Sequence, residues 1–181
     1  MHHSIPVVVM IFLWVFMNAP VAAQPTEKEV KAVAIEKLAI FIQWPEAAGL
    51  EKRQEFVIAV YNNEELGETI RNIYRGHPIK SRRVRVVNFT DPRKMPDCEV
   101  VFIPKVKRSI LYDILGKARQ ISALTVADTE GFADEGCCIN FYMEKGKLRF
   151  EINQSQMNAL GFTVDYKLLS IARLVKPSAG L

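Results

Sequence analysis

Three groups of residues in this sequence have side chains that could do chemistry: cysteines, a basic stretch and a cluster of carboxylates. The cysteines are Cys98, Cys137 and Cys138, so a disulfide from Cys98 to one of the adjacent pair, or a free thiol, are both open. A zinc site needs three or four closely spaced ligands, and beyond residue 3 the sequence holds one histidine, His77. We therefore expect no metal site.

The motifs that mark common catalytic sites are missing. No glycine-rich loop leads into a Gly-Lys-Ser/Thr signature that would hold a nucleotide phosphate, and no Gly-x-Ser-x-Gly elbow presents a hydrolase serine. One polar loop groups four carboxylates, which are Asp128, Glu130, Asp134 and Glu135. Such a cluster could hold a general base, but a solvated loop explains it better. We expect a binding protein with no cofactor, and not an enzyme.

The most basic stretch runs through Arg71, Arg75, Lys80, Arg82, Arg83 and Arg85. Arg83 and Arg85 alternate with valines, so both side chains should project from the same face of one strand. One interpretation is a site for an anion or an acidic partner, because guanidinium groups bind phosphate and carboxylate through two parallel hydrogen bonds. The other is an edge strand that its charges protect from edge-to-edge aggregation. We favour the second.

The elements that must position these residues alternate between helix and strand. Thr26 and Glu29 have the spacing of a capping box, and apolar residues then recur at helical spacing until Trp44-Pro45. The expected strands are 56–61, 84–89, 98–103 and 123–127, and the expected helices are 26–42, 63–74 and 107–120. This alternation predicts right-handed βαβ crossovers and a mostly parallel sheet with helices on both faces.

The pattern changes after residue 137. Two strands, 138–143 and 147–153, flank a hairpin turn at Glu144-Lys145-Gly146, and a short helical turn follows from Gln154 to about Gly161. A last helix is expected over Asp165–Val175, with Leu168, Leu169, Ile171, Ala172 and Val175 buried. The fold class is therefore α/β, with a mostly parallel central sheet, a C-terminal antiparallel hairpin and a C-terminal helix.

Two surfaces are candidates for binding. Open α/β sheets bind ligands beyond the carboxyl ends of their strands, which makes Asn62, Asn63 and Asp128 candidate ligand contacts. Arg83 and Arg85 are candidate contacts for an anion. The loop and hairpin of the C-terminal half are candidates for partner contact, through Phe132, Arg149, Glu151, Asn153, Met157 and Phe162. Trp44 could anchor a partner, although core packing is the better interpretation.

The first residues point to export. Residues 5–17 form an uncharged apolar run of about 13 residues, shorter than the ~20 that span a bilayer. Val21 and Ala23 suit the positions before a signal-peptidase cleavage site, so we expect a signal peptide at 1–23 and one domain over 24–181. An uncleaved membrane anchor is the alternative. The expected location is the periplasm of a Gram-negative bacterium, with no stable membrane insertion.

The composition of the 181-residue chain is that of an ordinary globular protein, with 49% hydrophobic and 24% charged residues. Its length gives a core that needs no disulfide or metal. The net charge of +4 is too small to argue for nucleic acid as a partner.

Several segments, taken in order, resemble the YfiR family of periplasmic regulatory proteins. They are Lys31–Ile42 with Gln43-Trp44-Pro45, Phe56–Val60, Cys98–Ile103, Leu124–Asp128 with Gly131-Phe132, Gly136, Ile139–Phe141, Arg149–Asn153, Gly161 and Leu168–Ala172. No segment is diagnostic alone, but their order and spacing together are specific.

This resemblance implies a repressor that binds the periplasmic sensor domain of an inner-membrane diguanylate cyclase and keeps cyclic di-GMP and biofilm formation low. It also implies an α/β domain, and a homodimer stays open. Well-known members carry two cysteine pairs, whereas Ala59 and Ala133 stand where partners for Cys98 and for the Cys137-Cys138 step would be sought, which weakens the case for disulfide switching. The alternative is a periplasmic small-ligand receptor, or a sensor subunit for another membrane signalling protein such as a histidine kinase.

Overall fold

The computed structural model describes residues 24–49 and 52–175, and the expected signal peptide lies outside them. The helices are α2 (Glu27–Phe41), α3 (Glu64–Ile73), α4 (Arg108–Ile121), α5 (Gln154–Ala159) and α6 (Tyr166–Leu169), with 3-10 turns η2 (Glu46–Ala48) and η4 (Pro92–Lys94). The strands are β1 (Ile42–Gln43), β2 (Glu55–Tyr61), β3 (Arg83–Phe89), β4 (Val100–Ile103), β5 (Leu124–Ala127), β6 (Ile139–Glu144), β7 (Lys147–Ile152), β8 (Thr163–Val164) and β9 (Arg173–Leu174).

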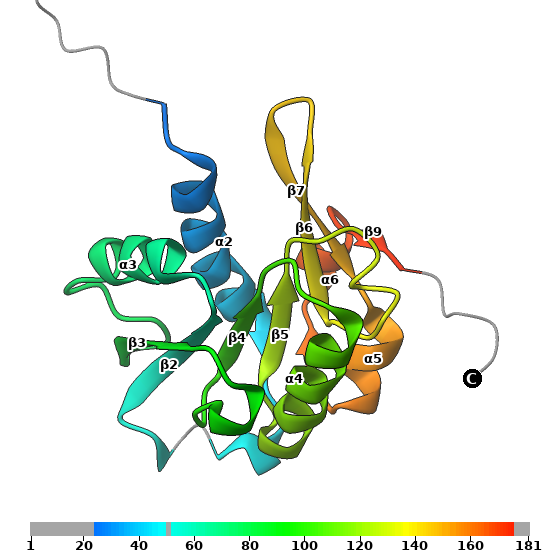
Figure 1. The fold of residues 1–181 in the computed structure, drawn as a ribbon. Helices are drawn as coiled ribbons and strands as arrows, with labels where there is room; N and C mark the ends of the chain where they lie inside the picture. The colour runs from blue at the N-terminus through cyan, green and yellow to red at the C-terminus, as the bar shows by residue number, and fades with distance from the viewer. Residues whose placement is uncertain (1–23, 50–51, 176–181) are drawn as a thin grey trace, which may run out of the picture.

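A mixed sheet of seven strands forms the centre of the molecule, in the order β3-β2-β4-β5-β6-β7-β9 (Figure 1). Neighbours from β3 to β6 pair in parallel, β6 and β7 form an antiparallel hairpin, and β9 returns parallel to β7. The short strands β1 and β8 pair separately. The structure thus confirms the α/β fold with a mostly parallel sheet and a C-terminal antiparallel hairpin.

Alternate residues of the buried strands face two separate cores. Phe56, Ile58 and Val60 of β2 join a cluster with residues of α2, α3, α5 and α6. Val57 and Ala59 join a second cluster with Leu111, Ile114 and Ala118 of α4. A strand that is buried on both faces reads as an unbroken apolar run, which explains the run at 56–61. Among the described helices, none is long and apolar enough to cross a bilayer.

Local signals place the element ends as expected. The Thr26 hydroxyl accepts a hydrogen bond from the Glu29 amide, and the Glu29 carboxylate accepts one from the Thr26 amide, which completes the capping box of α2. At the hairpin tip Lys145 and Gly146 have φ values of 48° and 73°. Two consecutive positive φ values suit the right-handed twist of a tight hairpin.

Helix α3 packs close against the edge strand β3 because Gly67 has no side chain. A Cβ atom on Gly67 would lie 2.2 Å from Oδ1 of Asn88 on β3. The helix therefore covers one face of β3 and does not cover the outer edge of that strand.

The expected helix over Asp165–Val175 is wrong in its second half. Helix α6 ends at Leu169, and the chain then forms β9, whose pairing with β7 is extended by a hydrogen bond from the Val175 amide to the Ile152 carbonyl. Leu168 is buried as expected, but Ile171 is 67% exposed. The open edge of β7 offers backbone hydrogen bonds that a second helical turn would leave unused, so sheet pairing overrides the helical spacing.

Candidate functional site

A cluster of charged residues around one buried carboxylate lies at the amino ends of three neighbouring parallel strands. Glu99 immediately precedes β4, Arg53 precedes β2 and Arg82 precedes β3, and these strands lie side by side in the sheet. The carboxyl group of Glu99 is fully buried and contacts the guanidinium groups of Arg82 at 3.2 Å and Arg53 at 3.5 Å. It also accepts a hydrogen bond from the Val57 amide, so this buried charge has the partners that its burial requires.

Trp44 covers this cluster from the side of α2. Its indole N–H donates a 3.0 Å hydrogen bond to the Glu99 carbonyl oxygen, and its ring packs edge-on against Phe56 and Phe162. The structure therefore confirms the core-packing interpretation of Trp44, although one face stays accessible.

A cavity of about 720 Å3 opens beside this tryptophan, between the end of α2 and the loops that lead into β2 and β3. Its lining residues are Gln43, Trp44, Pro45, Glu46, Gly49, Lys52, Arg53, Lys80, Ser81 and Arg82. The Lys80 ammonium lies 5.5 Å from the Trp44 ring centroid, and burial together with the nearby Arg82 charge lowers the pKa of Lys80. A basic, ring-lined cavity suits an anionic group.

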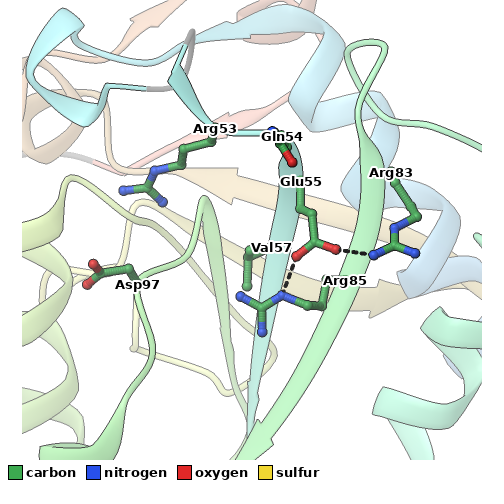
Figure 2. A pocket seen from close by; sticks show the side chains of 7 residues that line it. All are labelled: Arg53, Gln54, Glu55, Val57, Arg83, Arg85 and Asp97. Atoms are coloured by element: carbon green, nitrogen blue, oxygen red, sulfur yellow. Dashed lines mark hydrogen bonds and ion pairs between the residues drawn. The ribbon is translucent and has the colours of Figure 1, made fainter.

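A second cavity, of about 520 Å3, lies at the first residues of β2 and β3 (Figure 2). The Glu55 carboxylate at the start of β2 accepts hydrogen bonds from Arg83 at 2.5 Å and from Arg85 at 2.6 Å. These bonds hold the pKa of Glu55 below its ordinary value, the Arg83 bond most strongly. The shared contact confirms that both arginines project from the same face of one strand, and the strand is indeed at the edge of the sheet.

The residues expected to contact a ligand at the carboxyl ends of the strands each have a structural role. Asn62 adopts a left-handed φ of 44° in the turn after β2, and the Asn63 side chain caps α3 by accepting from the Leu66 amide. Asp128 accepts a 2.7 Å ion-paired hydrogen bond from Lys31 of α2. Burial lowers the pKa of Lys31, but its bonds to Asp128 and Glu27 outweigh this and raise it.

Three of the residues expected to contact a partner are buried. Phe132 belongs to the core cluster beneath α4, and Met157 and Phe162 belong to the cluster beneath α2. These side chains fill the interior, which corrects the expectation that they present a binding surface. The loop at Phe132 is polar in sequence, but it folds back so that its one aromatic ring packs under α4.

The other three expected partner residues lie at or near the surface of the hairpin. Arg149 is exposed on β7. Glu151 on the same strand binds the guanidinium of Arg173 and accepts a hydrogen bond from the side-chain amide of Asn140. Asn153 caps α5 and donates a 2.8 Å hydrogen bond to the Ala133 carbonyl oxygen. Glu151 and Asn153 therefore tie β9, α5 and the 128–136 loop to the sheet, and Arg149 stays the most available of the set.

All three cysteines are free, buried thiols. Cys98 and Cys137 belong to the core under α4, whereas Cys138 belongs to the opposite core. Burial raises the pKa of each thiol, which disfavours the reactive thiolate. Ala59 and Ala133 are also fully buried. In the part of the chain that is described, no three His, Cys, Asp or Glu side chains gather so as to hold a metal ion.

Sequence reasoning missed the Glu99 cluster, although the sequence contained a signal for it. A carboxylate directly before the apolar residues Val100–Ile103 is a charge entering a buried strand, and such a charge must find cationic partners. The partners that the structure shows are Arg53 and Arg82, and only the strand order β3-β2-β4 brings them to Glu99.

Solved structures resemble this chain in fold. A conserved domain protein from Vibrio cholerae O1 biovar El Tor matches with a TM-score of 0.53 and 14% identity, over 74% of this chain and 60% of that one. CD0873, a substrate-binding protein with adhesive properties from Clostridium difficile, matches in its ligand-free, open form with a TM-score of 0.51 and 11% identity, over 74% and 58%. The chain thus spans about three fifths of these structures.

None of the curated proteins compared with this chain matches it. The family model DUF4154, described as YfiR/HmsC-like, matches residues 28–173. That range runs from the first turn of α2 to the first residue of β9. The chain therefore belongs to the YfiR/HmsC-like family.

Proposed function

We propose that this protein is a periplasmic regulator that binds the sensor domain of an inner-membrane diguanylate cyclase and represses it. The observation that carries this proposal is the YfiR/HmsC-like family match over residues 28–173. The apolar segment before residue 24, with its suitable cleavage site, supports export of the domain that follows.

The surface chemistry supports binding as the activity. An apolar groove of about 420 Å3 lies between α2, the hairpin and α6, and is lined by Val30, Val33, Ala34, Lys37, Leu38, Phe41, Phe141, Leu148, Phe150, Leu168 and Ile171. The arginine-rich edge at β3 adds a charged surface. Apolar contact supplies affinity and charge supplies orientation in protein recognition.

The groups that could have acted as reagents are occupied or hidden. The thiols are buried and their pKa values are raised, and Asp128 is held by Lys31. Repression needs no reaction in this chain, because a signal that weakens partner binding by about 1.4 kcal/mol shifts the equilibrium tenfold.

The test is a deletion of the gene followed by measurement of cyclic di-GMP. We expect the level to rise, and the full chain to restore it. A chain that lacks residues 1–23 should fail to restore it, because it would stay on the wrong side of the membrane. Unchanged cyclic di-GMP and unchanged biofilm formation after deletion would contradict the proposal.

A second candidate function is reception of a small anionic ligand, which the cavity beside Trp44 favours. Its accessible ring and the charges of Lys52, Arg53, Lys80 and Arg82 suit a ligand with a carboxylate and a flat apolar part. A thermal-shift screen of such compounds, repeated with Lys80→Ala, distinguishes this function. A ligand that stabilises the protein but not this variant supports it, and no shift across the panel counts against it.

A further inference from the structure

The outer edge of β3 is open along its length. β3 pairs with β2 in parallel over seven residues, from Arg83 to Phe89, and it is the terminal strand of the described sheet (Figure 1). The Phe89 carbonyl accepts a 2.8 Å hydrogen bond from the Asn62 amide, so it points toward β2. Because backbone groups alternate along a strand, those of Val84, Val86 and Asn88 point away from the sheet.

Basic cavities flank this edge on both faces of the sheet. The cavity of about 520 Å3 is on the α4 side, where Arg53, Arg83 and Arg85 line it (Figure 2). A cavity of about 390 Å3 on the α3 side is lined by Arg71, Arg75 and Tyr74 together with Val84 and Val86. The side chains of an added strand would point alternately to the two faces, and would therefore enter both cavities.

Charge decides which strand this edge can accept. The two cavities are lined by five arginines, which are Arg53, Arg71, Arg75, Arg83 and Arg85, and by two carboxylates, Glu55 and Asp97. Arg53 is paired with Glu99, and Arg71 with Glu64 and Glu68, so the excess positive charge at this edge comes from Arg75, Arg83 and Arg85 against Glu55. The Arg83 and Arg85 side chains are 82% and 47% exposed. Two copies of this chain meeting at this edge would bring two sets of arginines together, and facing like charges are destabilising. An acidic strand would instead form favourable cross-strand pairs.

We propose that β3 is the docking edge for an extended, acidic segment of the signalling partner, which adds to the sheet beside β3. Main-chain hydrogen bonds to Val84, Val86 and Asn88 supply affinity, and the arginines on both faces select the acidic sequence. This inference rests on the proposed function for the identity of the partner. It assigns two roles to the charged edge, because the same arginines block self-association and select the partner.

Binding of an acidic peptide tests the charge requirement. The probe is a fluorescein-labelled peptide that repeats Glu-Glu-Val-Val over the length of β3, so that glutamates face both sides of the sheet. A peptide that repeats Lys-Lys-Val-Val is its counterpart. We expect the acidic probe alone to bind, more weakly as salt rises. The double variant Arg83→Glu, Arg85→Glu should lose affinity about tenfold or more.

A matched control exists in the same sheet. Lys145 and Lys147 at the tip of the β6–β7 hairpin are exposed and have the same alternate spacing, so Lys145→Glu with Lys147→Glu makes the same change in charge away from β3. This variant should bind the acidic probe to within about threefold of the wild-type affinity. Equal losses in both variants, or binding of both peptides alike, would show non-specific attraction and overturn the proposal.

Amide exchange measured by NMR on the unmodified protein tests strand addition itself. Adding the acidic peptide should slow exchange at the outward amides of Val84, Val86 and Asn88. Val86→Pro removes one outward donor and keeps the bonds to β2, so it should weaken binding without loss of the fold. No protection at these amides, protection elsewhere, or no binding of the probe would each overturn the proposal.

The inference and the proposed function fail separately. If the arginine variant still represses cyclic di-GMP synthesis in cells, the protein is a repressor that docks through another surface. If deletion of the gene leaves cyclic di-GMP unchanged while the peptide protects β3, the edge is a docking site for a partner of another kind.

Discussion

The strands at the two edges of the central sheet differ in length and in how further pairing is limited. At one edge, β9 contributes two residues and Arg173 is held over the Tyr142 ring, 4.1 Å from its centroid, while its guanidinium binds Glu151. At the other, β3 runs for seven residues with no described strand beyond it. A short strand held by side chains limits further pairing, whereas a long strand protected only by charge excludes some partners and admits others.

The largest loss of stability is expected from removal of Glu99, which binds the residues that lead into β2 and β3. Glu99→Ala would leave the guanidinium groups of Arg82 and Arg53 without their buried counter-charge. Breaking a buried ion pair from one side costs about 3 to 5 kcal/mol of unfolding free energy, which urea denaturation measures. Glu144→Ala, at an exposed pair with Arg149, is the control and should change stability by less than about 0.5 kcal/mol. Similar values for both variants would contradict the role of Glu99.

A smaller loss of stability is expected at the closed edge from Asn153→Ala. This change removes the cap of α5 and the hydrogen bond to the Ala133 carbonyl, and such caps contribute about 1 to 2 kcal/mol. The exposed Asn158 on the same helix provides the control variant, Asn158→Ala. If thermal unfolding showed no difference between the two, Asn153 would be free to serve as a binding residue.

A more local effect is expected from Glu151→Ala, which releases Arg173 from β7. The pairing of β9 should then open more often, by about 0.5 to 1 kcal/mol. Hydrogen exchange at the Val175 amide, which donates to the Ile152 carbonyl, reports this opening. Exchange at β3 amides should stay unchanged, and a matching change there would mean that the two edges are coupled.

The smallest effect is a dependence of the folding stability on pH, which arises at Glu55 beside the open edge. The pKa of Glu55 is lowered from 4.5 by hydrogen bonds from Arg83 and then Arg85. A lowered pKa in the folded state stabilises the fold above the unfolded value, and this contribution is lost as pH falls through the folded value. NMR titration of Glu55 should give a pKa below 4.5 in the wild type and one closer to 4.5 in Arg83→Ala, Arg85→Ala. The same titration midpoint in both proteins would remove these arginines as the cause.

Local signals in the sequence were enough for elements whose stability is local. The capping box at Thr26 and Glu29 and the turn at Lys145-Gly146 are decided by neighbouring residues, and the structure has both. The segment after Leu169 shows the limit of such reasoning. Its apolar spacing suits a helix. The open edge of β7, which is not a neighbour of this segment in the sequence, pairs with it as a strand.

The candidate site was only partly predictable for the same reason. Arg83 and Arg85 could be assigned to one face of an edge strand, because alternation along a strand is a local property. The position of Phe132 could not, since its polar neighbours suggested a surface loop while the fold turns its ring inward. The ion pairs of Glu99 could not be predicted without the strand order, because its partners lie just before the two strands that precede it in the sequence.

The position of the three thiols has a consequence for the biogenesis of this protein. Cys137 and Cys138 are consecutive but belong to opposite cores, so the finished sheet separates them from each other and from oxidants. A cysteine reacts with oxidants as its thiolate, and the thiolate forms far more readily in an unfolded chain. For a chain that reaches an oxidising compartment unfolded, as the proposed export implies, these thiols are therefore open to oxidation only until the sheet has formed.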